Sequence, residues 1–509
     1  MNRRLRGLAL FLVACYGALF IRLNVLQVFD ADDLNTQPDN KRRIERDFNR
    51  PRGDIVTADG RLVAHSDEER GQFHYQRTYP TGDLFAHVVG TYSFNYGSSG
   101  VERRYHDQLS GRTADFQLGG ITNPFSEEPN VGTVVLTLRS DVQEAAKQAL
   151  GDRKGSVVAI DPRSGAVLAL WSNPSYDPNL ISTNDDSVAK AARDLLAASP
   201  DKPQLARSYQ ERYFPGSTFK IVTAAAGLES GEVTATTPEF PKARSYQPPL
   251  TTRELSNFDG STCGGNVVDA LRVSCNSVFA QMAAELLGPD PMIKEAEDFG
   301  FNQTVPIDLP QPAKSVFPTD FGKPLRDGAN PGDAKVYENT PALAISAIGQ
   351  GDVSATPLQM ALVAAAVANG GTTMTPHVMA EIRDRDAKAV EKFDTSVWRE
   401  VMTSANAEVL RSAMVDVVAN GTASRLGIEG RVVGGKTGTA QLGTTPPRSH
   451  AWIIGFAGDP GAVPSVAVAV IVEGQPGASE QTGGKVAAPI ARSVLEAALR
   501  PISSPQPGG

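Results

Sequence analysis

The sequence predicts an α+β protein in which an antiparallel sheet lies between helical layers, preceded by a membrane anchor and a separate, charged N-terminal domain. Three observations support this prediction: a basic leader followed by an apolar stretch, then a mixed, charged region, then alternating strand and helix patterns. At 509 residues the chain exceeds a single typical core. The expected organisation is a cytoplasmic tail at 1–6, an anchor at 7–29, an N-terminal domain at 30–132, a main domain at 133–500 and a disordered tail at 501–509.

The N-terminal apolar segment predicts attachment to the plasma membrane. It runs from Gly7 to Ile21, is interrupted by Arg22 and continues to Phe29. Counted to Phe29 it can span a bilayer, with Arg22 reaching towards the outer interface. Counted only to Ile21 it is nearer the core of a signal peptide. Because no small-x-small cleavage site follows, we favour an uncleaved single-pass anchor, with the basic leader in the cytoplasm and everything from Asp30 outside.

The region 31–131 is mixed and charged, rich in Arg, Asp, Gly and Tyr, and lacks a catalytic constellation of its own. The net charge of the whole chain is −8, which argues against nucleic acid as a partner. The six histidines show no spacing typical of metal ligands, so no metal site is expected; they are His65, His74, His87, His106, His377 and His450. His450, near a motif described below, is interpreted as a strand-end residue.

From about Thr133 the pattern changes to regular elements. Runs of β-branched and apolar residues predict strands, a turn rich in Asp, Pro and Gly joins two of them, and apolar residues at helical spacing predict two helices. The order of elements fits an antiparallel sheet between helical layers. The expected strands are 134–137, 156–160, 166–170, 451–457 and 466–472, with the turn at 161–165 and helices at 141–150 and 486–499.

The segment Ser217-Thr218-Phe219-Lys220 predicts an activated serine. It is followed by a strongly helical run from Ile221 to Gly231, so Ser217 and Lys220 share one helix face. In the first turn the helix dipole favours an oxyanion and disfavours the ammonium form of Lys220. A neutral lysine can then act as base towards the serine. Taken alone, the tetrapeptide is more often an ordinary helix N-terminus with a solvated lysine.

Two further motifs follow in order. Ser274-Cys275-Asn276 lies between two apolar stretches, where a hydroxyl and a carboxamide can point into a cleft. Lys436-Thr437-Gly438-Thr439 precedes a strand; its hydroxyls and ammonium can hold a carboxylate, and Gly438 permits close approach of a ligand. Each motif alone is better explained as a polar cap or a strand end with a surface lysine. All three in this order supply the parts of an acyl-transfer site.

With these motifs the chain resembles the penicillin-binding proteins, whose motif set is Ser-x-x-Lys, Ser-x-Asn and Lys-Thr-Gly. Further segments are similar to the class B, monofunctional transpeptidase branch, and the length and short tail are similar to its actinobacterial penicillin-binding protein A group. The resemblance runs from about residue 1 to 500. Its further segments are 49–55, 97–102, 158–162, 165–169, 174–179, 347–351 and 355–361.

The resemblance implies the penicillin-binding serine transpeptidase fold, with residues 30–132 as an elongated pedestal and interaction domain. It also implies a peptidoglycan D,D-transpeptidase linked to cell division. The expected partners are stem peptides as D-Ala-D-Ala donor and amine acceptor, β-lactams, and membrane proteins of the division or elongation machinery. No cofactor is implied, and the pedestal is too short to be a glycosyltransferase. The implied catalytic residues are Ser217, Lys220, Ser274, Asn276 and Lys436, with Thr437, Gly438 and Thr439 binding substrate.

Three alternatives stay open. A class D-like β-lactamase or β-lactam sensor shares the motifs, although the motifs contain no extra base for hydrolysing the acyl-enzyme. A non-catalytic division scaffold would keep the fold, but the motif residues are intact. Carboxypeptidase activity on the same donor differs only in whether water or an amine attacks the intermediate, and the sequence does not identify an acceptor groove.

Two of the three cysteines are candidates for a disulfide. Cys263 and Cys275 lie in the part expected outside the membrane, where disulfides persist, and they flank a helix-length segment. A bridge would fix the neighbouring Ser274 and Asn276. The alternative is two free thiols, because the family motif does not require a cysteine at its centre. Cys15 lies in the anchor.

Overall fold

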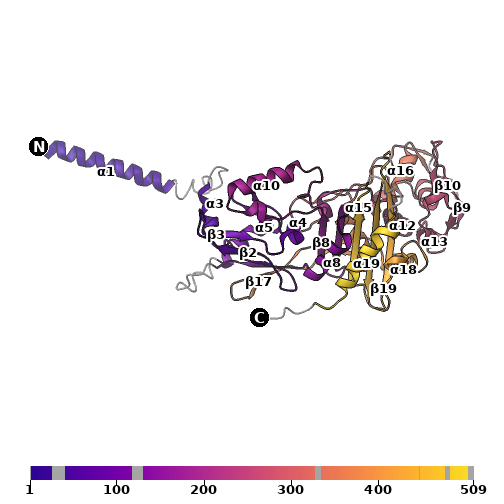
Figure 1. The fold of residues 1–509 in the computed structure, drawn as a ribbon. Coiled ribbons are helices and arrows are strands. Elements are labelled where there is room, and N and C mark those ends of the chain that lie inside the picture. The colour runs from indigo at the N-terminus through magenta and orange to yellow at the C-terminus, as the bar shows by residue number, and fades with distance from the viewer. Residues whose placement is uncertain are drawn as a thin grey trace.

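The computed structural model describes residues 2–25, 41–116, 130–326, 334–445, 447–475 and 482–502. Helix α1 (Asn2–Asn24) is set apart from the folded body (Figure 1) and is fully exposed. It is the one helix in the described ranges long and apolar enough to cross a membrane, as the sequence predicts for an anchor. Residues 26–29 of the predicted anchor, and 503–509 of the predicted tail, lie outside the described residues.

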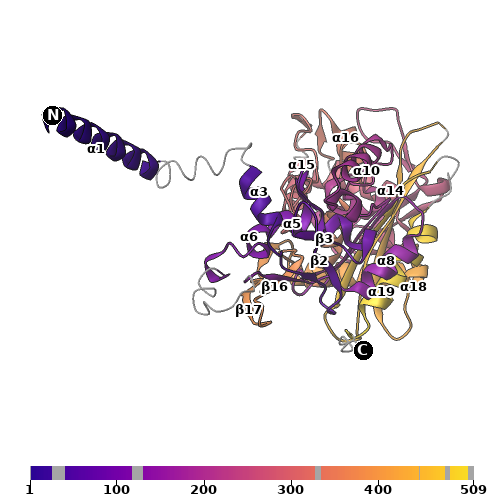
Figure 2. The ribbon, with the colours of Figure 1, turned by 60° about the vertical axis from the view of Figure 1, so that its left-hand side comes forward.

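A five-stranded antiparallel sheet forms the centre of the main domain. Its order is β19-β20-β21-β7-β8, so the last three strands of the chain pair with the hairpin that opens the domain. Helices α8 and α19 pack together on one face of the sheet (Figure 2), and α11 and α17 pack on the other, which is the layering expected from the sequence. The elements are β7 (Gly155–Ile160), β8 (Val167–Asn173), β19 (Val432–Gln441), β20 (Ser449–Gly458), β21 (Val466–Val472), α8 (Ser140–Leu150), α11 (Arg207–Gln210), α17 (Pro357–Ala368) and α19 (Ala488–Ala498).

A second sheet joins the N-terminal region to strands from far along the chain. Its order is β17-β16-β6-β1-β2-β3, with β1 and β6 parallel. Thus strands after residue 378 extend the sheet of the pedestal. The strands are β1 (Ile55–Val56), β2 (Leu62–Glu68), β3 (Tyr75–Thr78), β6 (Thr133–Leu136), β16 (Met379–Arg383) and β17 (Ala389–Lys392).

A buried ion cluster holds the pedestal together. Glu102 accepts hydrogen bonds from Arg52 Nε at 2.5 Å and Arg77 Nε at 2.7 Å, and all three side chains are buried. Arg52 and Glu102 come from the two N-terminal segments singled out in the sequence. Around them lie α3 (Lys41–Phe48), η2 (Gly82–Phe85), α4 (Ala86–Val89), β4 (Tyr92–Ser93), β5 (Gly97–Ser98), α5 (Gly100–Arg104), α6 (His106–Leu109), α9 (Asn179–Ser182) and α10 (Asp186–Ala198).

One carboxylate ties the pedestal to the main domain. Asp308 is buried and accepts hydrogen bonds from the hydroxyl of Tyr105 at 2.6 Å and from the backbone N–H groups of Val378 and Met379. Tyr105 follows α5, whereas the two amides lead into β16. The two parts of the chain are therefore joined by both a shared sheet and a buried hydrogen-bond cluster.

The remaining elements include α13, β9 and β10, which lie at the end of the molecule farthest from α1 (Figure 1). Several are short strands in two-stranded pairs, which carry too little pattern to be found from sequence. They are η3 (Gly216–Phe219), α12 (Lys220–Glu229), β9 (Phe240–Ala243), β10 (Ser245–Tyr246), β11 (Leu255–Ser256), η4 (Phe258–Gly260), β12 (Cys263–Gly265), α13 (Val267–Val273), α14 (Asn276–Gln281), η5 (Met282–Leu287), α15 (Pro289–Asp298), β13 (Pro324–Arg326), β14 (Val336–Tyr337), α16 (Thr340–Ser346), β15 (Thr372–Met374), β18 (Val397–Glu400), α18 (Ser404–Asn420), η6 (Ser424–Leu426) and η7 (Gly483–Ala487).

Candidate active site

Ser217 lies on a tight helical turn, η3, that runs directly into α12. Its side chain is partly exposed, and its hydroxyl has no hydrogen-bond partner within the described residues. The preceding Gly216 has a φ of 54° and donates its N–H to the carbonyl of Gly349 at 2.9 Å. A Cβ on Gly216 would lie 2.9 Å from the carbonyl oxygen of Thr439, so the glycine lets the serine turn touch the third motif.

Lys220 begins α12 and is completely buried. Its Nζ lies 2.6 Å from Oδ1 of Asn276, 2.8 Å from the carbonyl oxygen of Ser274 and 3.3 Å from Oγ of Ser274. The first and second motifs are therefore in direct contact. Asn276 is fixed from its other end as well, because its Nδ2 donates to the carbonyl of Ser256 at 2.8 Å.

Ser274 lies between the two motif lysines. It ends α13 in a left-handed conformation with φ 59° and ψ 45°, and Asn276 then starts α14. Lys436 is completely buried on β19, and its Nζ donates to Oγ of Ser274 at 2.8 Å. A chain of hydrogen bonds thus runs from Lys220 through Ser274 to Lys436, which is the geometry of a proton relay.

Burial disfavours the charged form of both lysines. Burial, and after it the neighbouring Lys436, lowers the pKa of Lys220 well below its ordinary value. Burial lowers the pKa of Lys436 to about 7. A neutral Lys220 has two N–H groups, which match the Asn276 Oδ1 and the Ser274 carbonyl, both pure acceptors. Its lone pair is then available to a hydroxyl proton.

The third motif is held against the serine turn by close backbone packing. A Cβ on Gly438 would lie 2.9 Å from Cγ2 of Thr218 and 3.0 Å from the carbonyl oxygen of Pro215. Glycine at this position therefore brings β19 to the start of η3. Thr439 is partly exposed on the same strand, whereas Thr437 is only 7% exposed.

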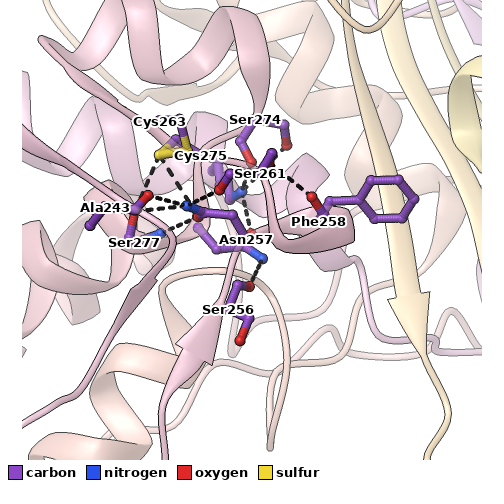
Figure 3. Close-up of a disulfide and its surroundings, with 11 residues drawn as sticks. Ala243, Ser256, Asn257, Phe258, Ser261, Cys263, Ser274, Cys275 and Ser277 are labelled. Carbon is purple, nitrogen blue, oxygen red and sulfur yellow. Dashed lines mark hydrogen bonds between the residues drawn. A yellow bond between two sulfur atoms is a disulfide. The ribbon is translucent and has the colours of Figure 1, made fainter.

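A disulfide joins Cys263 of β12 to Cys275 at the centre of the second motif. Figure 3 shows Asn257 beside it, a residue that the sequence did not single out. The Nδ2 of Asn257 donates to the carbonyls of Ala243 and Ser261 and to Oγ of Ser277, and its Oδ1 accepts from the Ser277 N–H. The disulfide and Asn257 together connect the small lobe of β9–β12 to the second motif.

The structure also shows the contacts of two further residues near the motifs, His450 and Thr422. His450 is the second residue of β20, opposite Ala440, and its Nδ1 accepts from the N–H of Gly474 at 3.0 Å. This agrees with its interpretation as a strand-end residue. Thr422, which no pattern singled out, places its Oγ1 2.6 Å from Oγ1 of Thr437. Only the folded chain brings these two threonines together.

Within the described residues, no group of three or more His, Cys, Asp or Glu side chains is placed to hold a metal ion. The residues gathered at the motifs are instead hydroxyls, amines and an amide. They can perform nucleophilic attack, proton transfer and anion binding from the side chains of the chain itself.

Comparisons with known proteins agree with this geometry. The family described as "Penicillin binding protein A dimerisation domain" matches residues 52–135. Peptidoglycan D,D-transpeptidase PbpA of Mycolicibacterium smegmatis is 36% identical over 521 residues, covering 98% of this chain and 99% of that protein. The PbpA of Mycobacterium tuberculosis is 35% identical over 520 residues, with the same coverage.

Solved structures are similar over most of the chain. Penicillin-binding protein A from M. tuberculosis as a ceftriaxone acyl-enzyme complex has a TM-score of 0.79 at 34% identity, covering 90% of this chain and 100% of that one. The penicillin G acyl-enzyme complex of the same protein has a TM-score of 0.76 at 34% identity, covering 89% and 100%. The family described as "Penicillin binding protein transpeptidase domain" matches residues 155–496, and the chain therefore belongs to the penicillin-binding protein transpeptidases.

Proposed function

We propose that this protein is a peptidoglycan D,D-transpeptidase that cross-links stem peptides through an acyl-enzyme on Ser217. The observation that carries the proposal is the hydrogen-bonded series Lys220, Ser274 and Lys436 beside the partly exposed Ser217 turn. A buried amine with a lowered pKa supplies the base that a serine needs to act as a nucleophile.

In the proposed reaction a stem peptide ending in D-Ala-D-Ala places its carboxylate near Lys436, Thr437 and Thr439. Neutral Lys220 takes the proton of Ser217 as Ser217 attacks the penultimate carbonyl. The oxyanion is held by the backbone N–H groups of Ser217 and Thr439, and one such donor contributes about 3 kcal/mol in related acyl transfer. Asn276 holds the donor amide. The carbon–nitrogen bond then breaks, leaving an ester on Ser217.

The departing D-alanine needs a proton, and Ser274 is placed to relay one. Its hydroxyl lies between Lys220 and Lys436, 3.3 and 2.8 Å from their Nζ atoms. Lys220, protonated by Ser217, passes this proton through Ser274 to the leaving amine and becomes neutral again, while Lys436 assists by donating to the Ser274 hydroxyl. An amine of a neighbouring stem peptide then attacks the ester, releasing Ser217 and forming the cross-link. No step requires a cofactor.

β-Lactams would acylate the same serine, because they present a strained amide and a carboxylate in the arrangement of the donor peptide. The relatives named above include penicillin G and ceftriaxone acyl-enzymes of an M. tuberculosis protein. This likeness supports a transpeptidase over a β-lactamase. The non-catalytic scaffold is disfavoured by the direct contacts among the motif side chains.

The proposed location is the plasma membrane, with α1 as a single-pass anchor, the N-terminus in the cytoplasm and the catalytic domain outside. The apolar, fully exposed α1 and the disulfide at Cys263–Cys275 support it, because disulfides persist outside the cytoplasm. Residues 30–132 are proposed as pedestal and 133–500 as catalytic domain. The proposed partners include membrane proteins of the division or elongation machinery.

The decisive experiment follows the intact mass of the full-length protein in detergent after a pulse of benzylpenicillin. A single adduct that persists for hours and maps to Ser217 is expected. An adduct that disappears within seconds while the drug is consumed catalytically would instead identify a β-lactamase. Cross-linked product from stem peptides, measured against hydrolysed product, then separates transpeptidase from carboxypeptidase activity.

A further inference from the structure

Thr422 contacts the third motif, although it belongs to none of the three. It follows α18 and Gly421, and its Oγ1 lies 2.6 Å from Oγ1 of Thr437. The Thr422 side chain is exposed, whereas Thr437 is nearly buried. In the part of the chain that the structure describes, each of these two hydroxyls has the other as its hydrogen-bond partner.

The backbone around Thr422 is held in place from two sides. A Cβ on Gly421 would lie 2.4 Å from the carbonyl oxygen of Arg272, so the end of α18 touches the end of α13 directly. A Cβ on Gly484 would lie 2.5 Å from the carbonyl oxygen of Thr422. Because α13 ends at Ser274, the segment at Thr422 bridges the second and third motifs. Thr422 is therefore a fixed neighbour of Thr437 and not a passing surface contact.

Two hydroxyls in contact share a single proton between their oxygens, so one donates and the other accepts. When Thr437 donates its proton to Thr422, it offers only lone pairs to a ligand. When Thr422 donates, the Thr437 proton is free, and the hydrogen bond that Thr437 receives polarises its own O–H and strengthens its donation. A ligand carboxylate can only accept, so it selects the second arrangement.

We infer that Thr422 is a positioning residue that orients the Thr437 hydroxyl as a donor and thereby favours donors ending in a carboxylate. The inference rests on the proposed function, in which Thr437 binds the terminal carboxylate of the stem peptide. The inference places the Thr422 hydroxyl behind the contact between Thr437 and the carboxylate. An aligned donor makes a stronger hydrogen bond to an anionic terminus than to a neutral one, so Thr422 contributes to the selectivity for a carboxylate.

The test compares two donors on the full-length protein in detergent. Both are N-acyl-D-alanyl thioesters, one with a carboxylate on the leaving group and the other with a carboxamide in its place. Attack by Ser217 breaks the carbon–sulfur bond and releases a thiol, which is measured directly. The variants are Thr422→Val, which keeps the shape and removes the hydroxyl, and Thr422→Ser, which keeps the hydroxyl. Ser412→Ala on the exposed face of α18 is the matched control.

Thr422→Val should lower kcat/KM for the carboxylate donor about tenfold, the size expected for one hydrogen bond that supports a charged group. It should change kcat/KM for the carboxamide donor less than about twofold. Thr422→Ser should keep the wild-type preference for the carboxylate donor. An equal loss on both donors would show a merely structural role and overturn the inference. Unchanged selectivity in Thr422→Val would also overturn it.

The experiment distinguishes a wrong role for Thr422 from failure of the proposed function. If the wild-type protein releases no thiol from either donor and forms no adduct on Ser217, the proposed function fails and the inference fails with it. If the wild type turns over both donors and Thr422→Val keeps the same ratio, only the role of Thr422 is wrong.

Discussion

Lys220 makes its hydrogen bonds to groups that a neutral amine can satisfy. Its three neighbours are a carboxamide oxygen, a backbone carbonyl and one hydroxyl, with no carboxylate among them. A carboxylate at that distance would stabilise the ammonium form and raise the pKa. Instead burial and the adjacent Lys436 both lower it. The residue types around Lys220 thus favour a base that is already deprotonated when substrate arrives.

This protonation state has a measurable consequence for acylation. Because its pKa is lowered, Lys220 loses its charge at a lower pH than an ordinary lysine, whose pKa is about 10.4. The rate constant for acylation by benzylpenicillin should therefore reach its plateau at a pH well below the ordinary lysine pKa. Stopped-flow measurement across pH tests this. A rate that still climbs tenfold per pH unit up to the ordinary lysine pKa would contradict it.

Ser217→Ala should abolish the penicillin adduct and leave the fold intact, because the partly exposed hydroxyl has no hydrogen-bond partner to lose within the described residues. Intact mass and thermal unfolding measure the two effects. Ser230→Ala, at the other end of α12, removes a hydroxyl bonded to the Gly227 carbonyl and should keep the adduct. Labelling that survives in Ser217→Ala would place the nucleophile elsewhere.

At the scale of elements, the long apolar strands were predictable and the short polar ones were not. The strand expected at 466–472 is β21, and 451–457 lies inside β20. Their continuous apolar runs reflect burial on both faces, which sequence records directly. The lobe of β9–β12 has strands of two to four residues, whose pairing depends on the disulfide and on Asn257. Such tertiary causes leave no periodic pattern.

In the same way, the sequence predicts the three motifs of the site but not the residues that support them. The three motifs were found because each keeps its residues within one short segment. Thr422 makes one hydrogen bond to Thr437 of the third motif, 15 residues away in sequence. Asn257 makes two hydrogen bonds to Ser277, 20 residues away and directly after the second motif. Ordinary threonines and asparagines have no distinguishing signal, so only the folded chain identifies them.

Loss of the Cys263–Cys275 disulfide should weaken both the lobe and the second motif. Its sequence separation is 12, and closing so short a loop contributes about 3 kcal/mol in the chain-entropy picture. The double variant Cys263→Ser with Cys275→Ser should lower the free energy of unfolding and slow acylation. Chemical denaturation and adduct formation measure the two. Cys15→Ser, in exposed α1, is the control and should change neither; a double variant as stable as the wild type would refute the prediction.

Helix α15 carries a carboxyl that opposes folding at alkaline pH. Glu295 is 2% exposed, and its Oε1 has no hydrogen-bond partner among the residues that the structure describes. Burial, then Asp298 and Glu229, raise its pKa to about 8, while Lys294 lowers it. The folded state thus holds a proton that the unfolded state releases above its ordinary pKa of 4.5. Stability contributed by this group is therefore present at low pH and is lost as pH rises to about 8.

Glu295→Gln removes this titration. Relative to the wild type, its free energy of unfolding should grow by about 1.4 kcal/mol per pH unit between the two pKa values and level off above the higher one. Urea denaturation at several pH values measures the difference. A difference that does not change with pH would show that Glu295 titrates normally.

At the scale of the whole molecule, the pedestal and the catalytic unit share one sheet. Strand β6 lies between β1 of the pedestal and β16, which comes more than 240 residues later in the chain. Asp308 adds a buried contact to Tyr105. Sequence reasoning placed a boundary near residue 132 because the pattern changes there, but strand pairing across that point is a tertiary feature that no local pattern contains.

Two fragments of the chain test whether the catalytic unit depends on this shared sheet. A fragment of residues 41–502 should be soluble, fold and form the Ser217 adduct, because it lacks only residues 1–40, which include α1, and residues 503–509. A fragment of residues 133–502 should unfold at a much lower temperature or aggregate, because it exposes the edge of β6 and the apolar side chains that packed on it. Thermal unfolding and adduct mass compare the two. Equal behaviour would show that the catalytic unit is independent of the pedestal sheet.

Under the proposed function the shared sheet also has a mechanical role. While Ser217 carries a stem peptide, one covalent chain connects the bilayer to the cell wall, and any relative movement of the two pulls on it. Tension from the anchor acts first on α3, which is held by the stacking of Phe48 on Tyr92. It is then transmitted to the catalytic unit where β1 pairs with β6, at Ile55 and Val134. The lifetime of the acyl-enzyme therefore sets how long this short parallel pairing, together with the buried Tyr105–Asp308 contact, must resist force.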